Sequence, residues 1–310
     1  MTKKIIFLGT PKIAADILNT ILTCDVEVIG VVCQPDRLGN RGKIVFGEVK
    51  ALCLEKKLNL FQPNKTKEII NELKELKPDL IITCAYGEIV SESILAIPKY
   101  GCINIHTSLL PKYRGAAPIN WVILNKEKQT GVTLMYMDKG MDTGDIIKQK
   151  KINIEQKETF TSLYDKLTLL GCNMIKDNIN LLFSSNIKKI KQDNKKATFA
   201  NKITREAEKI SFENDAITIE HQVRALYEKP LCYATYKNID VKILESDSLK
   251  SDFKVKCGEI VKIDKTGILV QTAKKTCLLI KKIQIPGKNP VLIKDYINGN
   301  SIFKIGERFN

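Results

Sequence analysis

Short apolar runs alternate with helix-like stretches over roughly the first 180 residues of the chain. The apolar runs have the length and composition of buried strands. They are KIIFLG, VEVIGVV, DLIITCAYG, CINI and GVTLMYM. This alternation predicts an α/β fold with an open, mostly parallel, Rossmann-like sheet.

The pattern changes in the second half of the chain. Residues 184–202, SSNIKKIKQDNKKATFANK, carry six lysines and one acidic residue with little periodicity, which indicates a basic surface linker. Further on, period-two runs such as YATYKNIDVKIL and GEIVKIDKTGILVQT alternate with turns, which predicts a small C-terminal β-barrel of OB type. A chain of 310 residues is long for one core, so we expect domains at 1–184 and 205–310 joined by a linker at 185–204.

The charge balance of the chain is strongly basic. Lys and Arg number 50 against 35 Asp and Glu, which gives a formal net charge of +15. Such an excess favours an anionic partner, and nucleic acid is the leading candidate. The alternative is a lysine-rich composition without such a partner, since charged residues make up an ordinary 27% of the chain.

Several classes of site and location are disfavoured by the composition. Nine cysteines are scattered without a CxxC pair, and histidine occurs only twice, so no zinc or other metal site is expected. Unpaired cysteines fit a reducing cytoplasm. The N-terminal apolar run is too short for a signal peptide and no stretch reaches transmembrane length, so we expect a soluble protein without a membrane partner. The turn Gly9-Thr10-Pro11 has one glycine where a dinucleotide fingerprint needs three, which disfavours nicotinamide or flavin.

Three polar residues near strand ends carry the chemistry of a candidate site. Asn104 and His106 end the run CINI, and Asp142 follows GVTLMYM within DKGMDTGD. Because ligands of open α/β sheets bind beyond the carboxyl ends of the strands, these side chains are expected to meet in one crevice. An amide and an imidazole can stabilise an oxyanion, and a carboxylate can orient the imidazole or accept a proton, which suits acyl transfer without a metal or an enzyme nucleophile. On residue types alone, a structural histidine beside an aspartate in a turn is the alternative.

Longer motifs around these residues resemble the folate-dependent formyltransferases. They are INIHTSLLPKYRGAAPIN at 103–120, AYG at 85–87 and GMDTGD at 140–145. Within that superfamily, GTPKIAAD, QPDRLGNRGK and the β-rich second half resemble the methionyl-tRNA formyltransferases. The similarity runs from about Ile5 to about Gly306 and is densest in the first half. It implies a catalytic domain over 1–184 and a tRNA-binding barrel over 205–310.

The resemblance implies a reaction and a role for each matching residue. The formyl group of 10-formyltetrahydrofolate would pass to the α-amine of methionyl initiator tRNA, giving N-formylmethionyl-tRNA for translation initiation. Asn104 and His106 would stabilise the tetrahedral oxyanion, while Asp142 would orient His106 and assist proton removal from the amine. The loop 138–145 would line the pterin pocket together with other folate contacts, which are Tyr86, Gly87, Ser108, Leu109, Leu110 and Pro111. We expect the protein to act as a monomer.

Basic residues in three segments are the candidate tRNA contacts. The loop QPDRLGNRGKIVFG combines arginines with glycines, and the family associates it with reading the acceptor end, for which Arg41 is the strongest candidate. Lys112 and Arg114 follow the folate motif and would reach either terminal tRNA phosphates or the glutamate tail of the folate. The full set is Arg37, Arg41, Lys43, Lys112, Arg114, Lys188 and Lys189. The alternative to tRNA contact is that the loop at 34–47 is only a mobile surface loop and that each lysine is only a solvated surface charge.

Two other functions are left open by the sequence. A formyltransferase acting on a nucleotide-linked amino sugar or on glycinamide ribonucleotide would share the three site residues, but would have little use for the Arg-bearing loop at 34–47 and the basic barrel. A non-catalytic RNA-binding protein is disfavoured because the site residues are intact. YEKPLCYA at 227–234 stands where the family usually has an NPWP-like turn, so tRNA docking at that corner is expected to differ. The second histidine, His221, matches no motif and is predicted to be structural or to lie at the surface.

Overall fold

The structure of the protein is a computed structural model, and it describes residues 2–38, 44–184, 186–299 and 301–310. The chain divides into two compact units. The first contains Met1–Pro118, Gln129–Asn153 and Tyr164–Asn201, and the second contains Ile119–Lys128, Ile154–Leu163 and Lys202–Asn310. The limits of the two units therefore differ from the domain limits expected from composition. Most of the basic segment groups with the first unit, and two segments of the first half group with the second.

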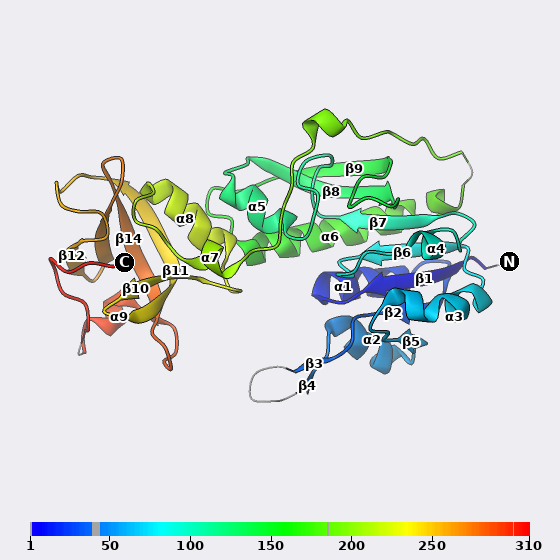
Figure 1. Cartoon of the computed structure of the whole chain (residues 1–310), viewed down its shortest axis with the longest axis horizontal. Coiled ribbons are helices and arrows are strands. Elements are labelled where there is room, and N and C mark those ends of the chain that lie inside the picture. The colour runs from blue at the N-terminus through cyan, green and yellow to red at the C-terminus, as the bar shows by residue number, and fades with distance from the viewer. Residues whose placement is uncertain (1, 39–43, 185, 300) are drawn as a thin grey trace. The chain divides into compact units, whose positions relative to one another are not determined.

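The first unit is built on a seven-stranded sheet in the order β5–β2–β1–β6–β7–β8–β9 (Figure 1). The pairs from β5 to β7 are parallel, whereas β7–β8 and β8–β9 are antiparallel. The predicted open, mostly parallel, Rossmann-like sheet is thus confirmed, with an antiparallel edge. Its strands are β1 (Lys4–Gly9), β2 (Glu27–Val32), β5 (Leu60–Phe61), β6 (Leu80–Cys84), β7 (Cys102–His106), β8 (Gln129–Tyr136) and β9 (Ile146–Asn153). A separate ribbon consists of β3 (Arg37–Leu38) and β4 (Ile44–Val45).

Helices α1 and α6 cover one face of this sheet. Ile13, Ile17 and Ile21 recur every four residues on α1 and are buried. On α6, a Cβ at Gly171 would lie 3.3 Å from Ile17 and 3.6 Å from Ile105 of β7, so a glycine allows close approach here. The helices are α1 (Lys12–Ile21), α2 (Glu48–Lys56), α3 (Ile70–Glu75), α4 (Glu92–Leu95) and α6 (Phe160–Asn178), and the 3₁₀ helices are η2 (Thr66–Ile69), η3 (Leu181–Phe183) and η4 (Asn194–Lys196).

The basic segment 184–202 pairs with the first unit through its main chain. Ile190 exchanges two hydrogen bonds with Ile146, at the start of β9, with N···O distances of 2.8 and 2.9 Å. Further along, the Arg114 N–H donates to Thr198 O at 2.9 Å, and the Ala200 N–H donates to Arg114 O at 2.7 Å. These bonds explain why the segment groups with the sheet rather than lying apart from it as a linker.

The second unit is built on an antiparallel sheet in the order β10–β11–β14–β13–β12, with β15 paired to β14 (Figure 1). Tyr236, Phe303 and Phe309 form the centre of its core, with ring centroids 4.9 to 5.6 Å apart. This sheet confirms the predicted small β-barrel type of domain. Its strands are β10 (Cys232–Tyr236), β11 (Ile239–Lys250), β12 (Ile260–Asp264), β13 (Gly267–Thr272), β14 (Thr276–Gln284) and β15 (Val291–Leu292), and the remaining helices are α5 (Pro118–Leu124), α7 (Arg205–Glu208), α8 (Ala216–Ala225) and α9 (Ile293–Tyr296).

Replacing Asp215 with alanine is expected to destabilise the second unit by about 1 kcal/mol, because its carboxylate caps α8. Asp215 Oδ1 accepts a hydrogen bond from the Thr218 N–H at 2.8 Å, and mainly for this reason its pKa falls to about 2. The carboxylate therefore stabilises the fold fully above its ordinary pKa near 3.8, and the contribution disappears as the pH falls through about 2. Thermal unfolding of Asp215→Ala and of the unaltered protein, at pH 7 and at low pH, measures the loss of stability and its dependence on pH. Glu228→Ala, at an exposed position of the same unit, is the control; an equal loss for both variants would contradict the capping role.

Candidate active site

Strand β7 carries two of the three predicted site residues on one face of the sheet. Successive strand residues alternate between faces, so Asn104 and His106 lie opposite the face on which Ile105 meets α6. His106 is 6% exposed, whereas Asn104 is half-buried. Helices α1 and α6 therefore pack on the face of β7 that carries Ile105, and Asn104 and His106 lie on the opposite face.

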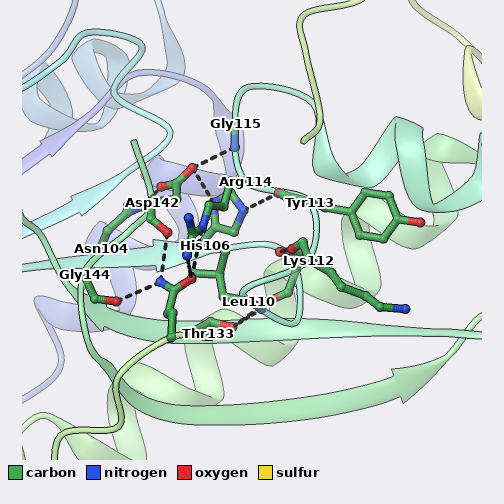
Figure 2. A network of polar contacts seen from close by, with 12 residues as sticks. Asn104, His106, Leu110, Lys112, Tyr113, Arg114, Gly115, Thr133, Asp142 and Gly144 are labelled. Atoms are coloured by element: carbon green, nitrogen blue, oxygen red, sulfur yellow. Dashed lines mark hydrogen bonds and ion pairs between the residues drawn. The ribbon is translucent and has the colours of Figure 1, made fainter. Parts of the chain in front are cut away.

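Asp142 meets both of these residues (Figure 2). Its Oδ1 accepts a hydrogen bond from Asn104 Nδ2 at 3.1 Å, and its Oδ2 lies 3.6 Å from His106 Nδ1. Oδ2 also accepts a hydrogen bond from the Gly115 N–H at 2.9 Å. The structure thus brings together the three residues that the sequence analysis singled out.

The strand direction that brings Asp142 to the site differs from the expected one, in which the carboxyl ends of β7 and β8 meet. Because β8 is antiparallel to β7, its last residue, Tyr136, pairs with Ile103 near the start of β7. The carboxyl end of β8 therefore points away from the carboxyl end of β7. The connection from β8 to β9 returns along β7, so that Asp142 reaches both Asn104 within the strand and Gly115 beyond it.

The loop 137–145 holds Asp142 in an uncommon backbone conformation, with φ at +53°. For a residue other than glycine this left-handed region costs about 1 kcal/mol or more, although aspartate tolerates it better than most. Within the loop, Asp138 accepts hydrogen bonds from the Gly140 N–H and the Thr143 hydroxyl. A Cβ at Gly144 would overlap the carbonyl oxygen of Tyr136, so only glycine allows the loop to close so tightly on β8.

The imidazole of His106 is oriented by a main-chain carbonyl. Nε2 lies 2.9 Å from Tyr113 O (Figure 2), and because a carbonyl only accepts, Nε2 carries a proton in this arrangement. Nδ1 is then the nitrogen that faces Asp142. At 3.6 Å this contact is too long for a hydrogen bond and is an ion pair when His106 is protonated.

The SLLP segment after β7 is anchored on β8 and β9. Ser108 Oγ donates to Lys112 O at 2.7 Å and closes the turn, while Thr133 Oγ1 donates to Ser108 O at 2.6 Å. Leu110 O accepts from Gln149 Nε2 at 2.8 Å, and its side chain packs with Met135 and Ile146. Ser108 is fully buried, so its hydroxyl serves the turn rather than the surface.

The loop after β6 contains the next predicted contacts, Tyr86 and Gly87. Tyr86 is 2% exposed, its hydroxyl lies 2.9 Å from Thr66 Oγ1, and burial raises the pKa of its phenol to about 12. Thr66 is held in turn by Glu88, which accepts from both its N–H and its hydroxyl. Gly87 is exposed with φ at +87°. The buried tyrosine therefore anchors the loop, and the loop presents Ala85, Gly87 and the 71% exposed Ile89 at the surface.

The predicted basic contacts fall into different environments. Arg37, Lys112, Lys188 and Lys189 are exposed, and Lys189 Nζ lies 4.2 Å from the centroid of the Tyr136 ring. Arg114 is 4% exposed, and its guanidinium donates to Gln192 and Asn194. Arg114 therefore joins two segments of the first unit and does not present its charge to solvent. Arg41 and Lys43 lie outside the described residues.

Sequence reasoning missed three groups that complete the site. The Tyr113 carbonyl and the Gly115 N–H are main-chain atoms, for which residue types give no signal. Gln192 lies in the segment predicted to be a basic linker, yet it bonds to Arg114 and to the main chain of the Asp142 loop. The signal available in the sequence was the presence of two amide residues, Gln192 and Asn194, among the lysines of this segment.

Within the described residues, no group of three or more His, Cys, Asp or Glu side chains is arranged to hold a metal ion. Across the same parts of the chain, no helix is both long and apolar enough to cross a membrane.

Comparison with known proteins places the chain in a family. Residues 3–179 match the family described as Formyl transferase, and residues 202–301 match Formyl transferase, C-terminal domain. The chain is 45% identical to the methionyl-tRNA formyltransferase of Malacoplasma penetrans, over 98% of this chain and 96% of that one. It is 41% identical to that of Clostridioides difficile, over 96% and 97%.

A solved structure shows the same fold. The N-formyltransferase from Helicobacter canadensis, in complex with folinic acid and dTDP-3-aminofucose, superposes with a TM-score of 0.67 at 22% identity, over 90% of this chain and 99% of that one. Since both parts of the sequence match formyltransferase domains and 45% identity extends over nearly its full length, the chain belongs to the methionyl-tRNA formyltransferase family.

Proposed function

We propose that the protein transfers the formyl group of 10-formyltetrahydrofolate to the α-amine of methionyl initiator tRNA, with Asn104, His106 and Asp142 as the catalytic residues. The observation that carries this proposal is the contact of Asp142 with both Asn104 and His106 on the polar face of β7. The product, N-formylmethionyl-tRNA, would serve translation initiation. Membership of the family supports the choice of substrates.

The geometry suits direct attack of an amine on a formyl carbon. The new N–C bond places negative charge on the formyl oxygen, and the attacking nitrogen must lose a proton. Asn104 Nδ2 carries two hydrogens, of which one is donated to Asp142 and the second can point to the oxyanion. His106 Nδ1, facing Asp142, can take and return a proton because Tyr113 holds Nε2. Collapse of the intermediate then breaks the bond to N10 of the folate, and that nitrogen takes up a proton.

The second substrate, the folate, needs a binding site beside these residues. We propose that Tyr86 and Gly87, with the SLLP residues Ser108, Leu109, Leu110 and Pro111, form its binding site. The SLLP turn is held in place by hydrogen bonds. Ser108 closes the turn itself, and Thr133 and Gln149 attach it to the sheet. Two exposed apolar side chains, Ile89 after β6 and Met141 before Asp142, offer contacts for a fused ring. The tight main-chain turns and few polar side chains suit a flat heteroaromatic ligand.

For the tRNA we propose contacts from the exposed basic residues Arg37, Lys112, Lys188 and Lys189, together with Arg41 and Lys43. Phosphates are recognised through such cations, and the net charge of +15 supports a large polyanion. An amino-sugar nucleotide would need far fewer positive charges. We expect a monomer, which sedimentation analysis would measure.

Replacing Lys188 and Lys189 together with alanine is expected to weaken tRNA binding about tenfold at low salt. The slope of log Kd against log salt concentration should fall by about 1 for each lysine removed, because fewer counterions are released. Filter binding of methionyl-tRNA at several salt concentrations measures both effects. The matched control removes Lys150 and Lys151, an adjacent exposed pair on β9. If both double variants behave alike, the proposed contact is wrong and only net charge matters.

The proposal as a whole is tested by formyl transfer from 10-formyltetrahydrofolate to initiator methionyl-tRNA, with elongator methionyl-tRNA and an amino-sugar nucleotide as alternative acceptors. Transfer to the initiator alone is the expected result. Transfer to the sugar alone would keep the active site and overturn the substrate. Folate binding without transfer to any of these acceptors would contradict the proposed reaction.

A further inference from the structure

Gln192 bonds both loops that form the active site. Its Oε1 accepts from Arg114 Nε at 3.0 Å and from Arg114 Nη2 at 2.7 Å. Its Nε2 donates to Asp142 O at 2.9 Å and to Gly144 O at 2.7 Å. One amide therefore connects the loop that follows β7 with the loop between β8 and β9, and it uses its acceptor for one and its donor for the other.

Each side of this bridge ends at a group that the proposed chemistry uses. On the acceptor side, Arg114 is buried between Tyr113, whose carbonyl orients His106, and Gly115, whose N–H donates to the Asp142 carboxylate. On the donor side, Nε2 holds the carbonyl of Asp142 itself. Asn194, two residues beyond Gln192, accepts a further hydrogen bond from Arg114 Nη2 at 2.8 Å.

The hydrogen bonds donated by Gln192 Nε2 hold the main chain where its conformation is unfavourable. Asp142 has φ at +53°, a conformation that persists only when its surroundings hold it. Asp138 ties the loop together internally, but its bonds go to Gly140 and Thr143 and do not reach the carbonyl of Asp142. The two hydrogen bonds from Gln192 fix that carbonyl and the next but one, on either side of Thr143.

We propose that Gln192 is a positioning residue for formyl transfer. It holds the main chain of Asp142 so that the carboxylate stays on Asn104, His106 and Gly115, and it contacts neither substrate. This inference rests on the proposed function. Because Gln192 lies in the same segment as the proposed phosphate contacts Lys188 and Lys189, the segment that meets the tRNA also maintains the geometry of the catalytic residues.

Glutamate at position 192 separates the two sides of the bridge. A carboxylate has the shape of the amide and still accepts from Arg114, now with a charge-assisted bond. It donates nothing, and its second oxygen would face the carbonyls of Asp142 and Gly144. Gln192→Glu thus keeps the link to Arg114 and removes the link to the Asp142 loop, whereas Gln192→Ala removes both.

The test measures single-turnover formyl transfer to initiator methionyl-tRNA at saturating concentrations, and the Kd of the tRNA separately. Both Gln192 variants are expected to slow the transfer step about 100-fold, since a displacement of about 1 Å in a catalytic group has an effect of that size. The tRNA Kd should stay within about threefold of the control. Gln129→Glu, an exposed glutamine of β8 in the same unit, is the control because it makes the same change of charge.

Hydrogen exchange of the loop 138–145 without substrates gives an independent readout. The amides of this loop should exchange faster in Gln192→Glu than in Gln129→Glu, while the rest of the sheet is unchanged. A transfer rate in Gln192→Glu close to that of the control would overturn the inference, and Gln192 would then be only an anchor for Arg114. If the unaltered protein transfers no formyl group, the proposed function fails, and unchanged exchange in Gln192→Glu would show separately that the bridge does not hold the loop.

Discussion

Replacing His106 with alanine is expected to slow formyl transfer by about 10,000-fold while folate and tRNA still bind. The imidazole is held by Tyr113 O at Nε2 and presents Nδ1 to Asp142, so its removal takes away the group that we propose takes and returns the proton. It also removes the cationic partner of the Asp142 carboxylate in the charged intermediate. The chain has one other histidine, His221, which belongs to the second unit and bonds through Nδ1 to Ile217 O.

Single-turnover transfer with isotopically labelled formyl donor measures the effect, with folate affinity and thermal unfolding as checks on the fold. His106 is buried, so His106→Asn is a second variant that fills part of the space with a polar group without restoring proton transfer near neutral pH. The matched control is His221→Ala, because His221 Nδ1 bonds to the carbonyl of Ile217 one turn earlier in α8, a helix of the second unit. Transfer continuing unchanged in both His106 variants would remove His106 from the catalytic residues.

The parts of the fold that could be predicted from sequence are those that local patterns determine. Strands β1 and β6 are continuous apolar runs because they are buried on both faces at the centre of the sheet. In the second unit, β10 alternates buried and half-buried residues, which is the period-two pattern of a sheet with one covered face. The fold class and the strand that carries both Asn104 and His106 follow from such patterns.

The features that could not be predicted are those that depend on strand direction and on main-chain contacts. The run GVTLMYM reads equally well as a parallel or an antiparallel strand, and β8 turned out to be antiparallel to β7. Proximity of Asp142 to Asn104 was therefore expected for a reason that does not hold in this fold. The segment 184–202 has no apolar periodicity, since it is fixed by backbone pairing at Ile190 and Ala200 and by the side chain of Gln192. Composition identifies its charge but not these contacts.

Replacing Asp142 with asparagine is expected to slow formyl transfer by about 1,000-fold without altering the loop. Asparagine has the same shape and adopts φ near +53° at least as readily as aspartate, so the backbone conformation should persist. What changes is charge and hydrogen bonding. The carboxylate accepts from Asn104 Nδ2 and from the Gly115 N–H, and an amide nitrogen in place of either oxygen would face one of these donors. The ion pair with protonated His106 is lost as well.

The size of this effect distinguishes a catalytic aspartate from a structural one. If Asp142 only shaped the loop, Asp142→Asn would transfer at nearly the normal rate, and Asp142→Ala, which has a stronger preference against positive φ, would be the damaging change. If the carboxylate takes part in the transfer, both variants lose activity while hydrogen exchange of the loop rises only in Asp142→Ala. Asp177→Asn, at an exposed position of α6, controls for the loss of one negative charge beside a polyanionic substrate. A normal rate in Asp142→Asn would remove Asp142 from the catalytic residues, leaving Asn104 to stabilise the oxyanion and His106 to move the proton.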